Sequence, residues 1–202
     1  MSPPPPYPRM SYLEAHPAPF LRTPLRVEEK LDGANVALWS GKGRTEVMSR
    51  GGPESMDRGR QLGRLRAWAA EHRDAMVALC GDGTVVYAEW LWRRHTVEYD
   101  ALPDWLVVLD LWRAGQGFVT AETRDERAGQ VGLLTPPIVR SDAVLTAVND
   151  ALGLLGPARW GRRLAEGIVL RTPTGLRCKV VRPDFVQRSD ELWVGELNQL
   201  AG

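Results

Sequence analysis

Short β-prone runs separated by turn residues constrain the fold of this chain most. Apolar and polar residues alternate over residues 25–31 and 34–40, and the pair Asp32-Gly33 between them favours a tight hairpin. Gly41-Lys42-Gly43 predicts a second turn before a strand at 45–49. Further strands are predicted at 84–92, 105–112, 118–120, 168–171 and 176–181.

Three stretches have helical spacing instead. Apolar residues recur at helical intervals from about 53 to 79, which predicts one long amphipathic helix or two. Residues 122–132 and 141–152 predict short helices, each opened by a residue that can cap it. Helices set between runs of strands, with few strand–helix–strand units, indicate an α+β fold built on antiparallel sheets.

The composition is that of an ordinary globular domain. At 202 residues, with 25% charged and 44% hydrophobic residues, the chain is long enough to bury a core in one domain. A net charge of +1 excludes a uniformly basic nucleic-acid wrapper, so any nucleic-acid surface must be a local patch. Cys80 and Cys178 have the spacing of neither a disulfide framework nor a zinc site.

The N-terminal sequence suggests neither export nor membrane insertion. Residues 1–6 include four prolines and lack the basic-then-apolar pattern of a signal sequence. No apolar run approaches the roughly 18 residues that indicate a membrane span. We therefore expect a cytoplasmic protein with a proline-rich, disordered tail over residues 1–6.

Six short motifs follow one another in a fixed order along the chain. They are Lys30-Leu31-Asp32-Gly33, Ser49-Arg50-Gly51, Tyr87-Ala88-Glu89-Trp90-Leu91, Leu109-Asp110-Leu111-Trp112, Glu166-Gly167-Ile168-Val169 and Arg177-Cys178-Lys179. Each motif alone is weak. The whole series is hard to obtain by chance, because only Lys30, Lys42 and Lys179 among the 26 basic residues are lysines.

The ordered series resembles the covalent nucleotidyltransferase superfamily, and within it the ATP-dependent RNA ligases of the RNA ligase 2 type. The resemblance covers residues 7–188, and it implies an adenylation domain with an ATP pocket between antiparallel sheets flanked by helices. Residues 189–202 are then expected to form a C-terminal extension without a separate C-terminal domain.

By this resemblance Lys30 is the nucleophile that takes AMP from ATP. An ordinary lysine amine is almost wholly protonated at neutral pH, whereas burial and a nearby cation such as Lys179 favour the neutral, reactive form. The alternative is an exposed lysine on an edge strand. Asp32 and Gly33 belong to the same motif and are expected in the catalytic and nucleotide-binding sets, respectively.

Glu89 and Glu166 lie in β-prone, apolar stretches, where carboxylates are rarely left without a partner. The resemblance implies that Glu89 binds the ribose and that Glu166 holds a divalent ion, Mg²⁺ or Mn²⁺, near the α-phosphate. Mg²⁺ suits such a site because it binds through one or two carboxylates and the phosphate oxygens of the nucleotide. The alternative is that both are structural ion pairs with arginine.

Two cations share one face of the last predicted strand, because Arg177 and Lys179 are two residues apart. Such a pair can hold a phosphate and neutralise charge during phosphoryl transfer. Family members usually have lysine at both positions, so Arg177 departs from the pattern. Arg50, beside two glycines, corresponds to an arginine that contacts nucleotide or nucleic-acid phosphate. A solvated arginine is the alternative.

The remaining expectations concern the base. Glu29 corresponds to a residue that reads the adenine amino group, and Asn35 to a polar position near the active site. Leu109 stands where relatives have an aromatic residue that stacks on the purine. Leu109 offers only an apolar surface, so Trp90, Trp92 or Trp112 would have to replace that ring. His95 matches a histidine of the subfamily and is assigned no role.

The predicted function is ATP-dependent joining of nucleic-acid strands, with RNA or an RNA-containing nick as the expected substrate. A lysyl-AMP would pass AMP to a 5′-phosphate, and a 3′-hydroxyl would then displace it, with a partner protein as one source of end recognition. Three alternatives remain: a capping-type guanylyltransferase, an enzyme that adenylates another acceptor, and a non-catalytic nucleic-acid-binding module.

Overall fold

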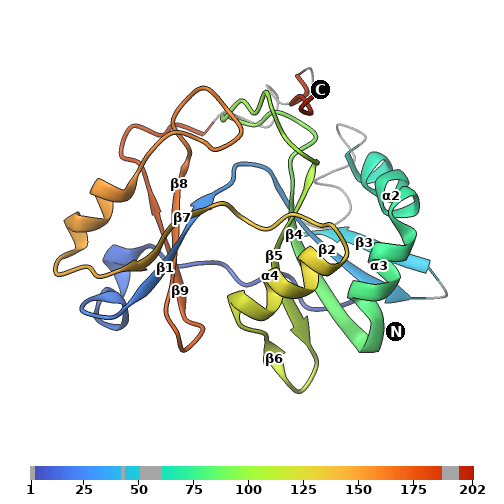
Figure 1. Cartoon of the computed structure of the whole chain (residues 1–202), viewed down its shortest axis with the longest axis horizontal. Helices are drawn as coiled ribbons and strands as arrows, with labels where there is room; N and C mark the ends of the chain where they lie inside the picture. The colour runs from blue at the N-terminus through green and yellow to red at the C-terminus, as the bar shows by residue number, and fades with distance from the viewer. Residues whose placement is uncertain (1–2, 42–43, 51–60, 188–195) are drawn as a thin grey trace.

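The computed structural model describes residues 3–41, 44–50, 61–187 and 196–202. Two antiparallel sheets stand side by side, as Figure 1 shows. The four-stranded sheet has the order β7 (Ile138–Ala143), β1 (Leu25–Lys30), β8 (Gly167–Arg171), β9 (Arg177–Val181). The five-stranded sheet has the order β3 (Arg44–Ser49), β2 (Ala34–Gly41), β4 (Thr84–Trp90), β5 (Leu106–Arg113), β6 (Gly117–Phe118).

Helices cover the five-stranded sheet and bridge to the other. α2 (Gln61–Glu71) and α3 (Arg73–Cys80) pack their apolar faces on β2, β3 and β4, and the buried Trp68 and Trp90 belong to the same core. α4 (Ala121–Gln130) begins at Thr120, whose hydroxyl caps Thr123 N, and it lies between the two sheets in Figure 1. Four 3₁₀ segments complete the fold: η1 (Leu13–Ala15), η2 (Ala18–Phe20), η3 (Gly81–Gly83) and η4 (Val148–Leu154).

The predicted α+β class with antiparallel sheets is confirmed, and so is the hairpin of β8 and β9. The pairing of β2 with β3 is also as expected, although residues 42–43 of its turn lie outside the described residues. The described part of the predicted 53–79 helix is two helices that break at His72. Its first residues, 53–60, lie outside the described residues.

The predicted hairpin around Asp32-Gly33 is wrong. β1 pairs with β7 and β8 in one sheet, whereas β2 pairs with β3 and β4 in the other. Asp32 instead anchors a crossover, because its carboxylate accepts the backbone N–H groups of Thr96 and Val97 at 2.7 Å each. The motif therefore lies where the chain passes between the two sheets.

The predicted helix at 141–152 is also wrong. Residues Ile138–Ala143 form the edge strand β7, because they pair with β1, and only the 3₁₀ segment η4 follows. The carboxylate of Asp150 accepts the backbone N–H groups of Thr146 and Ala147, which closes the start of η4. Pairing with a distant strand overrides the local helical spacing here.

The C-terminal residues lie against the loop that follows β4. Asn198 donates to the carbonyls of Leu91 and Arg93, which holds residues 196–202 beside the loop after β4.

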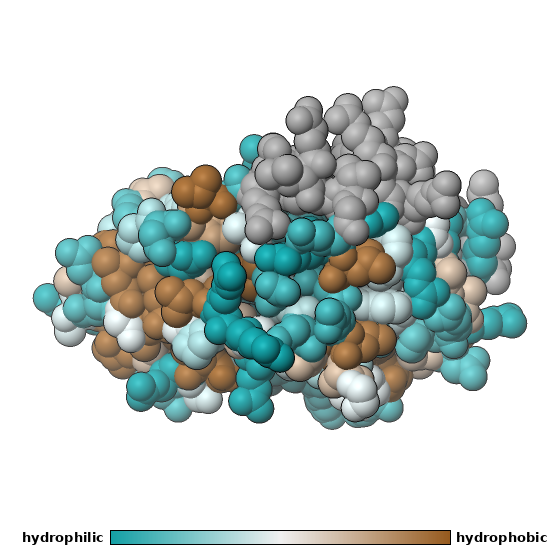
Figure 2. Space-filling model, turned by 90° about the horizontal axis from the view of Figure 1, so that it is seen from above, coloured by the Kyte–Doolittle hydropathy of each residue, from teal (hydrophilic) through white to brown (hydrophobic). Residues whose placement is uncertain are grey.

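Seen from above in Figure 2, the surface mixes hydrophilic and hydrophobic side chains, with the hydrophobic ones more frequent in the left half. None of the described helices has the length and apolar character that crossing a membrane requires.

Candidate active site

A cavity of about 220 Å³ opens between the two sheets, beside the end of β1. Its lining includes ten of the eleven residues that the sequence predicts for the site: Glu29, Lys30, Asp32, Gly33, Asn35, Arg50, Glu89, Leu109, Glu166 and Lys179. They come from both sheets and from the crossover, so residues 150 positions apart meet in one place. We call this the Lys30 cavity.

Lys30 and Glu166 face each other across neighbouring strands. In the pairing of β1 with β8, Lys30 lies opposite Gly167, and Glu166 is the residue just before β8. The Oε2 atom of Glu166 lies 2.6 Å from Lys30 Nζ. Both side chains are largely buried, at 21% and 12% exposed. Burial raises the pKa of Glu166, while the charge of Lys30 opposes that rise.

Glu89 is held by the crossover and by β2. Its Oε1 atom accepts Gly33 N at 3.0 Å, and Oε2 lies 3.5 Å from Asn35 Nδ2. A Cβ atom on Gly33 would lie 2.7 Å from the Trp90 carbonyl oxygen, so only glycine fits this close approach. Burial raises the pKa of Glu89 to about 7, although Lys30 pulls it down.

Glu29 lines the cavity, and one of its two carboxylate oxygens is hydrogen-bonded. Its Oε2 atom accepts Arg159 N at 2.8 Å, whereas the buried Oε1 has no hydrogen-bond partner among the described residues. Burial raises the pKa of Glu29 to about 7, against the lowering effect of Arg159. A buried acceptor without a donor is suited to a ligand that brings one.

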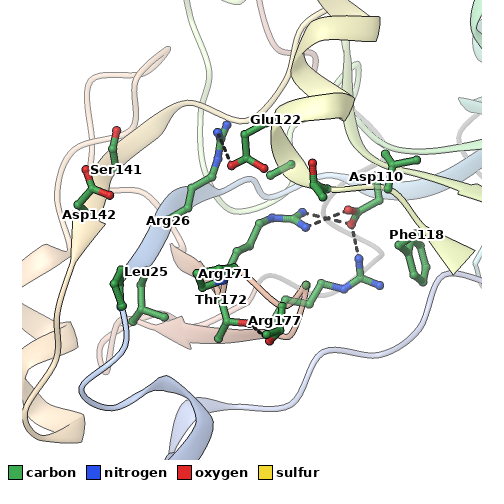
Figure 3. A pocket seen from close by; sticks show the side chains of 17 residues that line it. Leu25, Arg26, Asp110, Phe118, Glu122, Ser141, Asp142, Arg171, Thr172 and Arg177 are labelled. Carbon is green, nitrogen blue, oxygen red and sulfur yellow. Dashed lines mark hydrogen bonds and ion pairs between the residues drawn. The ribbon is translucent and has the colours of Figure 1, made fainter.

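The structure does not bring Arg177 to the Lys30 cavity. Arg177 pairs with Asp110 and lines an adjoining cavity of about 510 Å³. Figure 3 shows Arg171 and Arg177 both pointing at Asp110. The carboxylate of Asp110 also accepts a hydrogen bond from the Tyr7 hydroxyl. Lys179, two residues further along β9, does line the Lys30 cavity.

A sequence comparison identifies the family of this chain. The sequence model of the RNA ligase family matches residues 23–184, which is most of the chain. The chain belongs to the RNA ligase family. No curated protein matched it in a sequence comparison.

Solved structures of RNA and DNA ligases share this family fold. Naegleria gruberi RNA ligase with PPi is 13% identical over 86% of this chain and 54% of that one, with a TM-score of 0.61. A mutant of that ligase with ATP and Mn is 12% identical over 87% of this chain and 56% of that one, with a TM-score of 0.61. A putative ATP-dependent DNA ligase from Aquifex aeolicus is 21% identical over 87% of this chain and 49% of that one, with a TM-score of 0.57. The chain thus spans about half the length of these structural relatives.

Several residues that line the Lys30 cavity were not predicted for the site. Tyr7, Met10 and Val169 give the cavity apolar surface beside Leu109, whereas Trp90, Trp92 and Trp112 do not line it. Trp90 is instead core, fully buried against Trp68 and Trp105. No pattern in the N-terminal sequence marks Tyr7 or Met10, because their place depends on how that segment crosses the sheets.

A buried set of charges, which we call the intersheet ion network, lies behind the cavity. It comprises Arg26, Glu28, Asp110, Arg124, Asp125, Arg171 and Arg177. Glu28 on β1 accepts from Arg124 on α4 at 2.5 Å and from Arg171 on β8 at 2.7 Å. Arg124 and Arg171 both also donate to the Leu109 carbonyl on β5. The network therefore ties Leu109 and the strand before Lys30 to one rigid frame.

Proposed function

We propose that this chain is an ATP-dependent RNA ligase that reacts through a lysyl-AMP formed on Lys30. The observation that carries the proposal is the Lys30–Glu166 contact in a cavity that Lys179 and Arg50 also line, within a domain of the RNA ligase family. One amine, two further cations and two buried carboxylates are the groups that nucleotidyl transfer requires.

In the first step Lys30 Nζ attacks the α-phosphate of ATP, a nitrogen–phosphorus bond forms, and pyrophosphate leaves. Lys30 must lose a proton to attack, and Glu166 is the carboxylate in contact with it. Lys179 and Arg50 are placed to stabilise the negative charge that develops on the phosphate oxygens.

The later steps move AMP onto nucleic acid. A 5′-phosphate oxygen attacks the lysyl-AMP, which frees Lys30 and forms a 5′–5′ pyrophosphate linkage. A 3′-hydroxyl then attacks the 5′-phosphate, so that a phosphodiester forms and AMP leaves. We propose RNA or an RNA-containing nick as the substrate, and a partner protein as one source of end recognition. Cytoplasmic location remains a prediction from the sequence.

The residues fit a purine nucleotide and a divalent ion. Glu29 Oε1 is a buried acceptor suited to a purine amino group, and Leu109, Met10 and Val169 offer apolar surface for the ring. The described residues hold no preformed cluster of three metal-ligating side chains. Glu166 with phosphate oxygens and water would suffice for Mg²⁺, which when bound neutralises phosphate charge.

Covalent labelling tests the proposal. The protein is incubated with Mg²⁺ and α-labelled ATP or, separately, α-labelled GTP, and is then run on a denaturing gel. We expect label from ATP and not from GTP, and sealing of a nicked duplex with RNA at the 3′-hydroxyl side. Label from GTP alone would indicate a guanylyltransferase. Label from neither nucleotide would favour a non-catalytic binding module.

A second expected result concerns Glu89. Because this carboxylate is buried, its charged form should lower the stability of the folded protein. Its folded pKa of about 7 exceeds the ordinary 4.5, so ionisation destabilises the fold progressively between those pH values and fully above pH 7. Glu89→Gln should therefore unfold at a higher temperature than wild type at pH 8, with the difference vanishing near pH 4. Adenylation should fall at least ~10²-fold because a charged acceptor is lost.

Thermal unfolding at a series of pH values, together with ATP labelling at pH 8, checks this trade-off. A Glu89→Gln variant that loses cooperative unfolding while its folded fraction labels normally would show that Glu89 is a structural residue only.

A further inference from the structure

The N-terminal segment crosses from one sheet to the other. The Pro5 carbonyl accepts a hydrogen bond from the Tyr87 hydroxyl on β4, and the Ser11 carbonyl accepts one from Lys179 N on β9. Figure 1 shows this segment running across the gap between the sheets. Tyr7, Pro8 and Met10 line the Lys30 cavity on the way. All of these N-terminal residues precede residue 23, where the match to the RNA ligase family begins.

Tyr12 ends this crossing and places its ring beside Lys179. The two residues form a β-bridge, and Lys179 Nζ lies 4.3 Å from the centre of the Tyr12 ring. Tyr12 is half exposed and does not line the Lys30 cavity. Tyr12 therefore contacts the lysine from outside the cavity.

The two lysines of the cavity are held in different ways. Lys30 has a carboxylate partner, Glu166, at 2.6 Å. No salt bridge among the described residues involves Lys179. An aromatic face attracts an ammonium group through its quadrupole without neutralising its charge. Tyr12 can thus orient Lys179 without engaging its ammonium group in an ion pair.

We propose that Tyr12 is a positioning residue, whose ring holds the Lys179 ammonium group ready to contact the phosphates of the nucleotide. The role of Lys179 in this statement rests on the proposed function. A carboxylate in place of the ring would compete with phosphate for the same ammonium group, whereas the ring leaves the lysine available when nucleotide enters.

The first test is the second-order rate constant of self-labelling at subsaturating α-labelled ATP. Tyr12→Leu, which keeps apolar bulk but removes the ring, should lower it about 2- to 5-fold, the range expected for an exposed cation–π contact. Tyr12→Phe, which keeps the ring, should match wild type. Phe185→Leu is the matched control, because Phe185 lies 5.3 Å from the Arg182 guanidinium and neither residue lines the Lys30 cavity.

A double-mutant cycle on binding separates positioning from general stability. The dissociation constant of α,β-methylene-ATP, which cannot release pyrophosphate, is measured by calorimetry for wild type, Tyr12→Leu, Lys179→Met and the double variant. Tyr12→Leu should weaken binding about 2- to 5-fold when Lys179 is present, and it should have no effect when Lys179 is methionine.

The outcomes are distinct. Equal labelling of Tyr12→Leu and wild type overturns this inference, and so does equal slowing of Tyr12→Leu and Tyr12→Phe. A Tyr12→Leu effect that persists without Lys179 also overturns it. If wild type is not labelled by ATP at all, the proposed function fails, and the binding cycle still decides whether Tyr12 acts through Lys179.

Discussion

Replacing Lys30 with alanine is expected to abolish covalent labelling by α-labelled ATP. The proposed bond forms at Lys30 Nζ, and Lys179, the other described lysine, has its ammonium group against the Tyr12 ring. Wild-type protein should carry label that acid removes and mild base does not, as a lysine phosphoramidate requires. Denaturing electrophoresis after incubation with Mg²⁺ and labelled ATP measures both properties.

Lys30→Arg is the matched control for this experiment. Arginine keeps the positive charge and can keep the ion pair with Glu166, but it stays protonated and is not a nucleophile. We expect the arginine variant to unfold at nearly the wild-type temperature and to remain unlabelled. Label on either variant would assign the nucleophile to another residue, and a base-labile adduct would indicate a carboxylate.

Removing the charge of Glu28 is expected to have the largest effect on stability. Glu28 is 1% exposed and lies among Arg26, Arg124 and Arg171, so Glu28→Gln leaves three guanidinium groups near an uncharged amide. Losing one partner of a buried ion pair typically costs about 3–5 kcal/mol of unfolding free energy. Denaturant unfolding of wild type and Glu28→Gln measures the loss.

The pH dependence of that loss has a definite sign. Burial by itself would raise the pKa of Glu28, but Arg171 and Arg124 outweigh it and hold the pKa at about 2. The stabilisation is therefore complete above the ordinary glutamate value of 4.5 and disappears as the pH falls toward 2. Wild type and Glu28→Gln should converge in that window.

Glu46→Gln provides the comparison. Glu46 pairs with Arg44, whose side chain is 73% exposed, and pairs of this kind contribute about 0–1 kcal/mol. A Glu28→Gln loss no larger than that of Glu46→Gln would mean that the intersheet ion network does not hold the sheets together.

The sequence predicts which residues gather around one cavity better than it predicts the chain path. Ten of eleven predicted residues meet in one cavity, because short motifs carry residues such as Lys30, Glu89 and Glu166 together with the strands that position them. Arg177 is the exception. Strand alternation does put it on the same face as Lys179, but two residues along a strand are roughly 6–7 Å apart. At that distance Asp110 binds Arg177 in the adjoining cavity.

The local sequence pattern predicts strands, but it does not predict which strands pair with each other. Asp32-Gly33 has the residues of a hairpin turn, yet β1 pairs with β8, about 140 positions away, since Val27 and Ile168 share a buried core there. Residues 138–143 likewise become a strand only because β1 offers an edge. The places of Tyr7 and Glu28 depend on these pairings too, so neither could be assigned from the sequence.

Because β1 and β2 belong to different sheets, the two sheets can form at different times while the chain is synthesised. All strands of the five-stranded sheet lie within residues 34–118, so they can pair before the later part of the chain emerges. β1 is made first, but its partners β7 and β8 come more than 100 residues later. The strand that ends in Lys30 must therefore wait, and the ribosome releases its last partners only after residue 171. The Lys30 amine is thus made early, whereas its strand can complete its pairing only late.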